Sequence, residues 1–133
     1  LMPRVLELRD TIAPETIIIG NGDVVSLAEM EEKYSQYGCD GFMVGRGIFA
    51  NPWIFNPEID MQTITIQHRI DLYLHHIELF EKQWGGKKNF ALLKKFAKTY
   101  ISNFTDSAAF REKLMETKTL EALREKLQNY CST

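Results

Sequence analysis

The sequence has few cysteines and no long apolar run. These two features argue against a disulfide-rich secreted protein and against a membrane-spanning one. Cys39 and Cys131 are the only two cysteines among 133 residues. They are too few for a disulfide framework and too far apart in sequence to suggest a metal site. No signal-peptide pattern or apolar stretch of membrane-spanning length is visible. We therefore expect a protein of the reducing cytoplasm.

Net charge is also low, at −2, but the charges are distributed unevenly. Residues 1–57 contain 4 Lys and Arg against 8 Asp and Glu, which gives −4, whereas residues 58–133 contain 12 against 10, which gives +2. The second part is therefore the more favourable side for a polyanionic partner. Charge alone is a weak argument, because mixed-charge helical surfaces are common.

The stretch from residue 16 to residue 44 has the pattern of a β-α-β unit. Residues 16–19 (TIII) and 41–44 (GFMV) are short apolar runs, and an unbroken run rich in Ile suits a parallel strand covered on both faces. Ser26 followed by Glu29 predicts a capping box that opens a helix. Gly38 is well placed to end that helix in a left-handed conformation.

A glycine-bearing turn follows each predicted strand. Residues 20–23 (GNGD) follow the first, and residues 45–47 (GRG) follow the second, with another helix expected from Ile48 to Asn51. Residues 20–23 include types that tolerate positive φ. Glycines let backbone N–H groups approach an anion, and Arg46 adds a charged, bidentate donor. Because parallel strands end at the same edge of a sheet, the two turns together predict a phosphate site. Tight packing of strand against helix is the alternative explanation for the glycines.

Three motifs in this order and spacing resemble one known family. They are GNGD at residues 20–23, DGFMVGRG at 40–47 and NPWIF at 51–55. Together they resemble the end of the flavin barrel of tRNA-dihydrouridine synthases, strongly up to Phe55 and more loosely afterwards. The resemblance implies an α/β plus all-α protein: the last βα units of a (β/α)₈ TIM barrel, followed by a small helical bundle. Because such a barrel typically needs about 250 residues, we expect a C-terminal fragment.

The resemblance also implies a reaction and its cofactors. Family members use FMN to exchange a hydride with C6 of a tRNA uracil, forming 5,6-dihydrouridine, and NADPH reduces the flavin. The residues matched to the family's cofactor site are Asn21, Gly22, Asp23, Gly45 and Arg46. Since the Asp23 carboxylate would repel a phosphate, we expect its main chain to bind and its side chain to brace the turn.

No catalytic residue is expected within this chain. The resemblance places the family's acidic cysteine on a loop much earlier in the barrel, and neither Cys39 nor Cys131 matches that context. Cys39 precedes a predicted strand and suits a small core position. We therefore predict that these 133 residues by themselves neither reduce uridine nor hold FMN tightly.

A second domain is predicted from about residue 58, where the pattern becomes helical. Apolar residues recur at helical spacing in four segments, which begin near Thr65, Phe90, Ser107 and Thr119. The first should end at Trp84 before two glycines, and the second near Asn103. These segments predict a small helical bundle spanning residues 58–133, after a first domain spanning residues 1–57.

A run of lysines marks the candidate RNA-contacting surface of the second domain. The lysines lie around the Gly85–Gly86 turn and on the helix that follows it. They are Lys82, Lys87, Lys88, Lys94, Lys95 and Lys98. Lysines on one face suit phosphate contact, and the family's helical domain binds tRNA. An ordinary solvated helix face is the alternative. The chain departs from the family pattern at Lys94 to Phe96 and at Thr99, whereas Phe110 and Arg111 agree with it.

The remaining expectations concern metals, other functions and self-association. His68, His75 and His76 share one predicted helix without metal-ligand geometry, so no metal site is expected. Two other functions remain open: a different FMN- or phosphate-binding barrel enzyme, and a non-catalytic RNA-binding or assembly module. Two barrel strands without their neighbours would expose apolar faces and unpaired edges, so we also expect the chain to self-associate.

Overall fold

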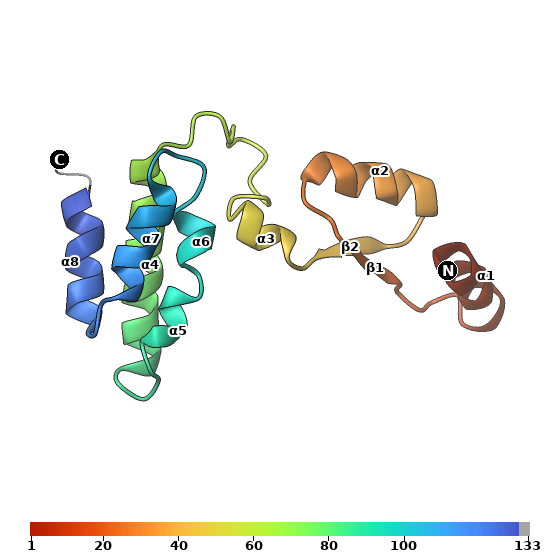
Figure 1. Cartoon of the computed structure of the whole chain (residues 1–133). Coiled ribbons are helices and arrows are strands. Elements are labelled where there is room, and N and C mark those ends of the chain that lie inside the picture. Colours follow the sequence, from red (N-terminus) through yellow and green to blue (C-terminus); the bar gives the residue numbers. More distant parts are fainter. Residues whose placement is uncertain (131–133) are drawn as a thin grey trace. The chain divides into compact units, whose positions relative to one another are not determined.

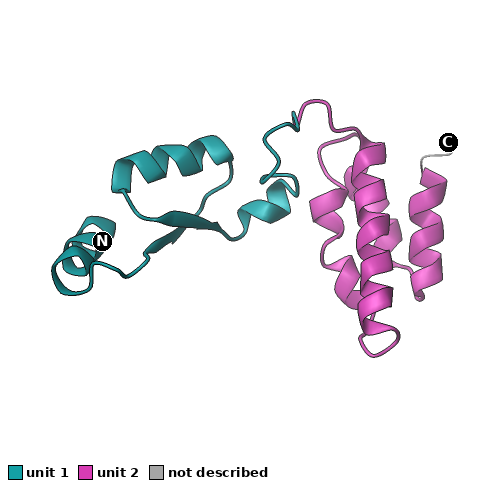
Figure 2. Ribbon diagram, turned by 180° about the vertical axis from the view of Figure 1, so that it is seen from behind, with its two compact units in different colours: residues 1–60 teal, residues 61–133 magenta. Residues whose placement is uncertain are grey.

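The computed structural model describes residues 1–130 and divides the chain into two compact units. These are Leu1–Asp60 and Met61–Thr133, coloured separately in Figure 2. The sequence pattern places a boundary near residue 57, close to this division. Cys131 lies outside the described residues.

The first unit alternates helices with two short strands (Figure 1). Its elements are α1 (Met2–Ile12), β1 (Ile19–Gly22), α2 (Leu27–Tyr37), β2 (Gly41–Val44) and α3 (Gly47–Ala50). The strands pair in parallel, with Ile19 opposite Gly41 and Gly22 opposite Val44. This arrangement confirms the predicted parallel β-α-β unit.

The position of β1 differs from the expected one. Residues 16–19 were predicted as the strand, but β1 consists of Ile19–Gly22, so most of the GNGD motif is strand rather than turn. The reason lies at Ile18, whose N–H donates to the Asp40 carboxylate at 2.7 Å and whose carbonyl accepts from the Asp40 N–H at 2.9 Å. These bonds fix the first paired position at Ile19 and Gly41. Neither Gly20 nor Gly22 adopts positive φ.

The expected burial of the first strand on both faces is also not seen in the described residues. Ile17 is 71% exposed and Ile19 53%, and Met43 of β2 is 51% exposed. Gly20 is buried because the Phe42 ring lies over it, where an added Cβ would come within 2.5 Å of a ring carbon. The sheet therefore leaves apolar side chains uncovered within this unit.

Helix α2 begins and ends as predicted, with one change in its cap. The Ser26 hydroxyl accepts from the Glu29 N–H at 3.1 Å, as in a capping box. The Glu29 carboxylate, however, accepts from the Val25 N–H at 2.9 Å rather than from Ser26. The helix ends at Gly38, where φ is 68°. Together these caps define the crossover between β1 and β2.

The second unit is helical. It contains α4 (Ile66–Trp84), α5 (Ala91–Lys94), α6 (Ala97–Tyr100), α7 (Ser107–Met115) and α8 (Leu120–Tyr130). Helix α4 contacts both α6 and α8. These helices bury one cluster of side chains: Ile70, Tyr73, Ile77, Leu93, Ala97, Ile101, Phe110, Leu114, Leu123 and Leu127. The helices predicted from Thr65, Ser107 and Thr119 are confirmed.

The helix predicted from Phe90 to about Asn103 is wrong in one respect, because it is broken at Lys95 and Phe96. The Leu93 carbonyl accepts from the Phe96 N–H at 3.0 Å, a tight bond across three residues. It also accepts from the buried Tyr73 hydroxyl of α4 at 2.9 Å. Burial raises the pKa of that hydroxyl, which keeps it a donor. The apolar pattern alone predicts one continuous helix here. The break lies beside a hydrogen bond from another helix, which that pattern does not reveal.

Candidate functional site

The five residues expected to bind a cofactor phosphate meet in one open pocket of about 470 Å³. The pocket is lined by Asn21, Gly22, Asp23, Gly45 and Arg46. They meet because Gly22 and Val44 are paired at the ends of the parallel strands, so that the residues after each strand lie at the same edge of the sheet.

The glycines of this region have two different roles. A Cβ added at Gly22 or Gly45 would meet no heavy atom within 4 Å, so open space lies beside both backbones. A Cβ added at the buried Gly47 would lie 2.1 Å from the Val24 carbonyl oxygen. Gly47 therefore permits close packing of the two turns, whereas the sequence-based alternative for the glycines was packing of strand against helix. Gly22 and Gly45 leave room for a group in the pocket.

An ion pair joins the two turns. The Arg46 guanidinium donates to the Asp23 carboxylate at 2.5 Å, and the two side chains are 83% and 80% exposed. Such an exposed pair contributes little to stability. The pair keeps the Arg46 guanidinium beside the pocket. The remaining N–H groups of the guanidinium can still donate to an anion. The Asp23 side chain thus contacts the neighbouring turn.

The helix after the second turn is short. α3 spans four residues, Gly47–Ala50, where the sequence predicts a helix from Ile48 to Asn51. A single turn sums few peptide dipoles and attracts an anion weakly. An anion in this pocket would therefore depend on nearby backbone N–H groups and on Arg46.

Sequence reasoning missed the polar contact that sets the position of β1. The Asp40 carboxylate accepts from the Ile18 N–H and from the Arg9 guanidinium, which lies 2.9 Å away. The Ile18 N–H and then Arg9 hold the pKa of Asp40 below its ordinary value. The signal in the sequence was Asp40 itself, directly before the second strand. Its partners cannot be read from spacing because they are 22 and 31 residues away.

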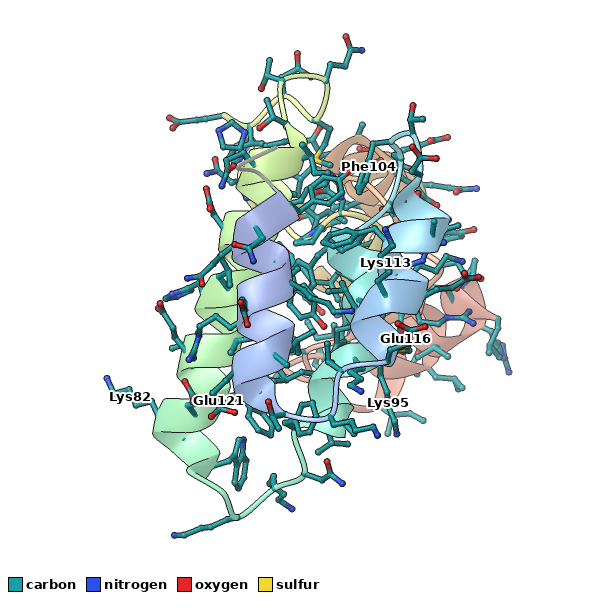
Figure 3. All side chains as sticks on the ribbon, turned by 60° about the vertical axis from the view of Figure 1, so that its left-hand side comes forward. Lys82, Lys95, Phe104, Lys113, Glu116 and Glu121 are labelled. Atoms are coloured by element: carbon teal, nitrogen blue, oxygen red, sulfur yellow. The ribbon has the colours of Figure 1, made fainter. Side chains whose placement is uncertain are left out.

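The lysines proposed from the sequence do not form one uniform face. Lys87 and Lys88 are exposed in the turn after α4, whereas Lys95 and Lys98 border a groove of about 640 Å³ between α5–α6 and α7. The groove is lined by Lys94, Lys95, Ala97, Lys98, Ala108, Arg111, Glu112, Met115 and Glu116. Figure 3 shows Lys95 and Glu116 on the same side of the helices, with Lys82 on the opposite side. One wall of the groove is therefore mainly basic, and the other carries both signs.

Lys94 differs from the other lysines because its ammonium is bound within the protein. It donates to the Met115 carbonyl at 2.9 Å and to the Thr117 carbonyl. These carbonyls lie at the C-terminal end of α7, where a cation is favourable. Lys94 therefore connects α5 to the end of α7.

The three histidines have local contacts in the second unit. His68 accepts the N–H of the N-cap residue of α4 at 3.2 Å, and His75 lies 3.6 Å from a neighbouring glutamate. His76 is 3.0 Å from the Tyr100 hydroxyl, and burial lowers the pKa of its ring. Among residues 1–130, no three His, Cys, Asp or Glu side chains are grouped to hold a metal.

Cys39 is buried, and its Sγ lies 3.5 Å from the Gly41 carbonyl. This position agrees with the small core residue predicted from the sequence. Within the same described part of the chain, no helix is long and apolar enough to cross a membrane.

Comparison with known proteins gives consistent matches. The model of one family, dihydrouridine synthase, matches residues 2–133. A probable tRNA-dihydrouridine synthase of Staphylococcus epidermidis is 34% identical over 131 residues, which cover 98% of this chain and 40% of that protein. Probable tRNA-dihydrouridine synthase 2 of Bacillus subtilis is 31% identical with the same coverage. The chain thus spans about 40% of the length of these relatives.

Substitutions at the two kinds of glycine should differ greatly in their effect on stability. Gly47→Ala should lower the free energy of unfolding of the first unit by about 2 kcal/mol or more, because the added methyl overlaps the Val24 carbonyl. Gly45→Ala, the matched control, should change it by less than about 0.5 kcal/mol, because no atom lies nearby. Urea unfolding followed by circular dichroism measures both. Equal destabilisation by the two substitutions would contradict the assignment.

Proposed function

The chain belongs to the dihydrouridine synthase family, and from that premise we propose that it supplies the FMN-phosphate pocket and the tRNA-contacting helices of a tRNA-dihydrouridine synthase. The whole enzyme would reduce uridine to 5,6-dihydrouridine in cytoplasmic tRNA, with NADPH as the reductant of the flavin. The observation that carries the proposal is the pocket itself. Five residues chosen from sequence motifs line one cavity at the ends of two parallel strands.

We place the first unit in the last βα units of a TIM barrel. The parallel strands, the helical crossover and the turns at one edge are the local features of such a barrel. The exposed Ile17, Ile19 and Met43 side chains suit positions that further barrel elements would cover. The relatives are long enough to contain those elements, since this chain matches only 40% of their length.

The pocket fits a phosphate group in its donors and its free space. Gly22 and Gly45 leave room beside the backbone, and Asn21 and Arg46 offer side-chain donors. Bound FMN would supply hydride exchange with C6 of the uracil. The residues of this chain would bind the phosphate end and orient it. The Asp23 carboxylate, by pairing with Arg46, would be partly neutralised toward the anion.

We assign no catalytic residue to these 133 residues. Cys39 is buried against the Gly41 carbonyl and so is not available to a substrate. The chain by itself is therefore proposed to be inactive, with the cysteine that handles the C5 proton supplied by another part of the enzyme. The flavin ring would also need further barrel elements.

For the second unit we propose RNA contact through Lys87, Lys88, Lys95 and Lys98. Their exposed ammonium groups suit phosphate contacts that position an RNA without reading its sequence. Lys94 would contact a phosphate only by giving up the carbonyls at the end of α7. A non-catalytic RNA-binding module shares these lysines, so the FMN pocket distinguishes the two functions.

Arg46→Gln should weaken FMN binding by the whole enzyme about tenfold or more, because a charge-assisted contact to the phosphate is lost. Arg4→Gln is the matched control, since Arg4 is an exposed arginine that pairs only locally with Glu7. Quenching of flavin fluorescence measures both affinities. If the unsubstituted enzyme binds no FMN, or if both variants bind it equally well, the pocket does not serve this cofactor.

Replacing Lys95 and Lys98 together by Ala should weaken tRNA binding by the chain and flatten its salt dependence, because fewer counterions are released. Replacing Lys113 and Lys118, two exposed lysines away from the groove lining, serves as the control with the same change of charge. Titrations with unmodified tRNA at two salt concentrations measure the slope. Equal slopes for the two double variants would show that binding depends only on overall charge.

The exposed sheet predicts that the chain alone self-associates. Ile17, just before β1, and Ile19, the first residue of β1, are uncovered in a two-stranded sheet, and open strand edges recruit partners. Ile17→Lys with Ile19→Lys should shift the population toward monomer, because edge lysines oppose pairing. Sedimentation velocity over a range of concentrations measures this. A single monomeric species of the unsubstituted chain at every concentration would contradict the prediction.

A further inference from the structure

An indole side chain lies exposed at the end of α4, beside the first lysines of the proposed RNA surface. Trp84 is 41% exposed, and it is the only exposed Phe, Tyr or Trp side chain among residues 61–130. The other side chains of these three types in that range are buried or half-buried. An aromatic ring on the surface of an otherwise well-packed unit is therefore a feature that the core does not explain.

The backbone after α4 holds Trp84 at a tight turn. Gly85 and Gly86 have φ values of 36° and 77°, which residues with a Cβ rarely adopt. The Gly85 N–H donates to the Glu81 carbonyl at 2.8 Å, and the Lys87 N–H donates to the Trp84 carbonyl at 2.7 Å. The two glycines thus reverse the chain immediately after the indole and place Lys87 and Lys88 close to it.

The residues next to this ring in sequence carry positive charge. The Lys88 ammonium lies over the Trp84 ring, 5.3 Å from its centre, and Lys82 and Lys87 are exposed nearby in sequence. No acidic residue occurs from Lys82 to Asn89, and the preceding Glu81 is paired with Arg124 of α8. An exposed aromatic face with adjacent cations matches the chemistry of a nucleotide, which has a flat π-system and a phosphate.

We propose that Trp84 is a stacking platform for an unpaired nucleobase of RNA, with Lys87 and Lys88 contacting the phosphates that flank that base. This inference rests on the proposed function, in which the second unit contacts tRNA. An unpaired base is specified because bases within a duplex already stack on their neighbours, whereas bases in loops and ends are free to stack on aromatic side chains. The lysines contribute affinity without sequence preference, and the indole selects single-stranded segments.

The first experiment detects stacking of a base through the fluorescence of Trp84 itself. The chain has two tryptophans, so Trp53→Phe leaves Trp84 as the only indole. A single-stranded RNA oligonucleotide should quench its fluorescence strongly, and a blunt duplex containing the same strand should quench it weakly.

The second experiment measures affinity by the anisotropy of labelled RNA and does not depend on Trp53. Trp84→Ala should weaken binding of the single strand about tenfold, and Trp84→Phe should retain most of it because a ring remains. Leu79→Ala is the matched control. Leu79 is 50% exposed on the same helix, and a five-residue offset places it about 140° away around the axis. It should bind as the unsubstituted chain does.

Each other outcome overturns the platform in a distinguishable way. If Trp84→Ala binds the single strand normally while replacing Lys95 and Lys98 weakens tRNA binding, the platform is wrong and the proposed function stands. If the chain binds neither RNA nor tRNA, both fail together. If anionic phosphatidylserine vesicles shift Trp84 emission while the oligonucleotide does not, the surface binds lipid instead.

Discussion

The pairing of β1 with β2 is the constraint on which the candidate cofactor site depends. The Asp40 carboxylate accepts hydrogen bonds from the Ile18 N–H and the Arg9 guanidinium, and these bonds fix where the two strands begin to pair. With that register, Gly22 and Val44 lie opposite each other, and both following turns reach the same pocket. A shift by one residue would separate the turns and invert the faces of the strand. An acidic residue outside the pocket therefore controls its geometry.

The second unit depends on a different kind of constraint, which is the burial of α4. Tyr73 of this helix is fully buried and donates to the carbonyl of Leu93 in α5, just before the break between α5 and α6. Around this break, Lys95 and Lys98 line the groove beside α7, while Lys94 binds the end of α7. The arrangement of the lysines thus follows from a buried hydrogen bond as well as from helical periodicity.

Local signals predicted most elements of the fold, and tertiary contacts account for the errors. The helix from Ser26 to Gly38 was readable because its cap and its stop are encoded by neighbouring residues. The first strand was misplaced because three isoleucines favour a strand by propensity, whereas the Ile18–Asp40 bonds decide its start. Periodicity also missed the break at Lys95. In both cases the deciding partner lies 20 or more residues away.

The grouping of the motif residues around one pocket was easier to predict than the bounds of the neighbouring strand. A motif identifies residues even when their secondary structure is assigned wrongly. Asn21 and Gly22 were expected in a turn and lie in β1, yet they still border the pocket. The distinction between Gly45 and Gly47 was not predictable, since both fit a glycine-rich turn. It depends on the Val24 carbonyl, which the packing of the two turns brings against Gly47 alone.

The two proposed ligands, FMN and tRNA, need different electrostatic surroundings, and the two units differ in charge. The first unit, residues 1–60, carries a net charge of −6, so as a whole it does not attract a phosphate. A phosphate would have to be bound there by short-range donors, such as backbone N–H groups, Asn21 and Arg46. The second unit, residues 61–133, carries +4, and its exposed lysines act at longer range, where salt weakens attraction strongly. A cofactor that stays bound and an RNA that must be released therefore suit a local pocket and a diffuse charged surface, respectively.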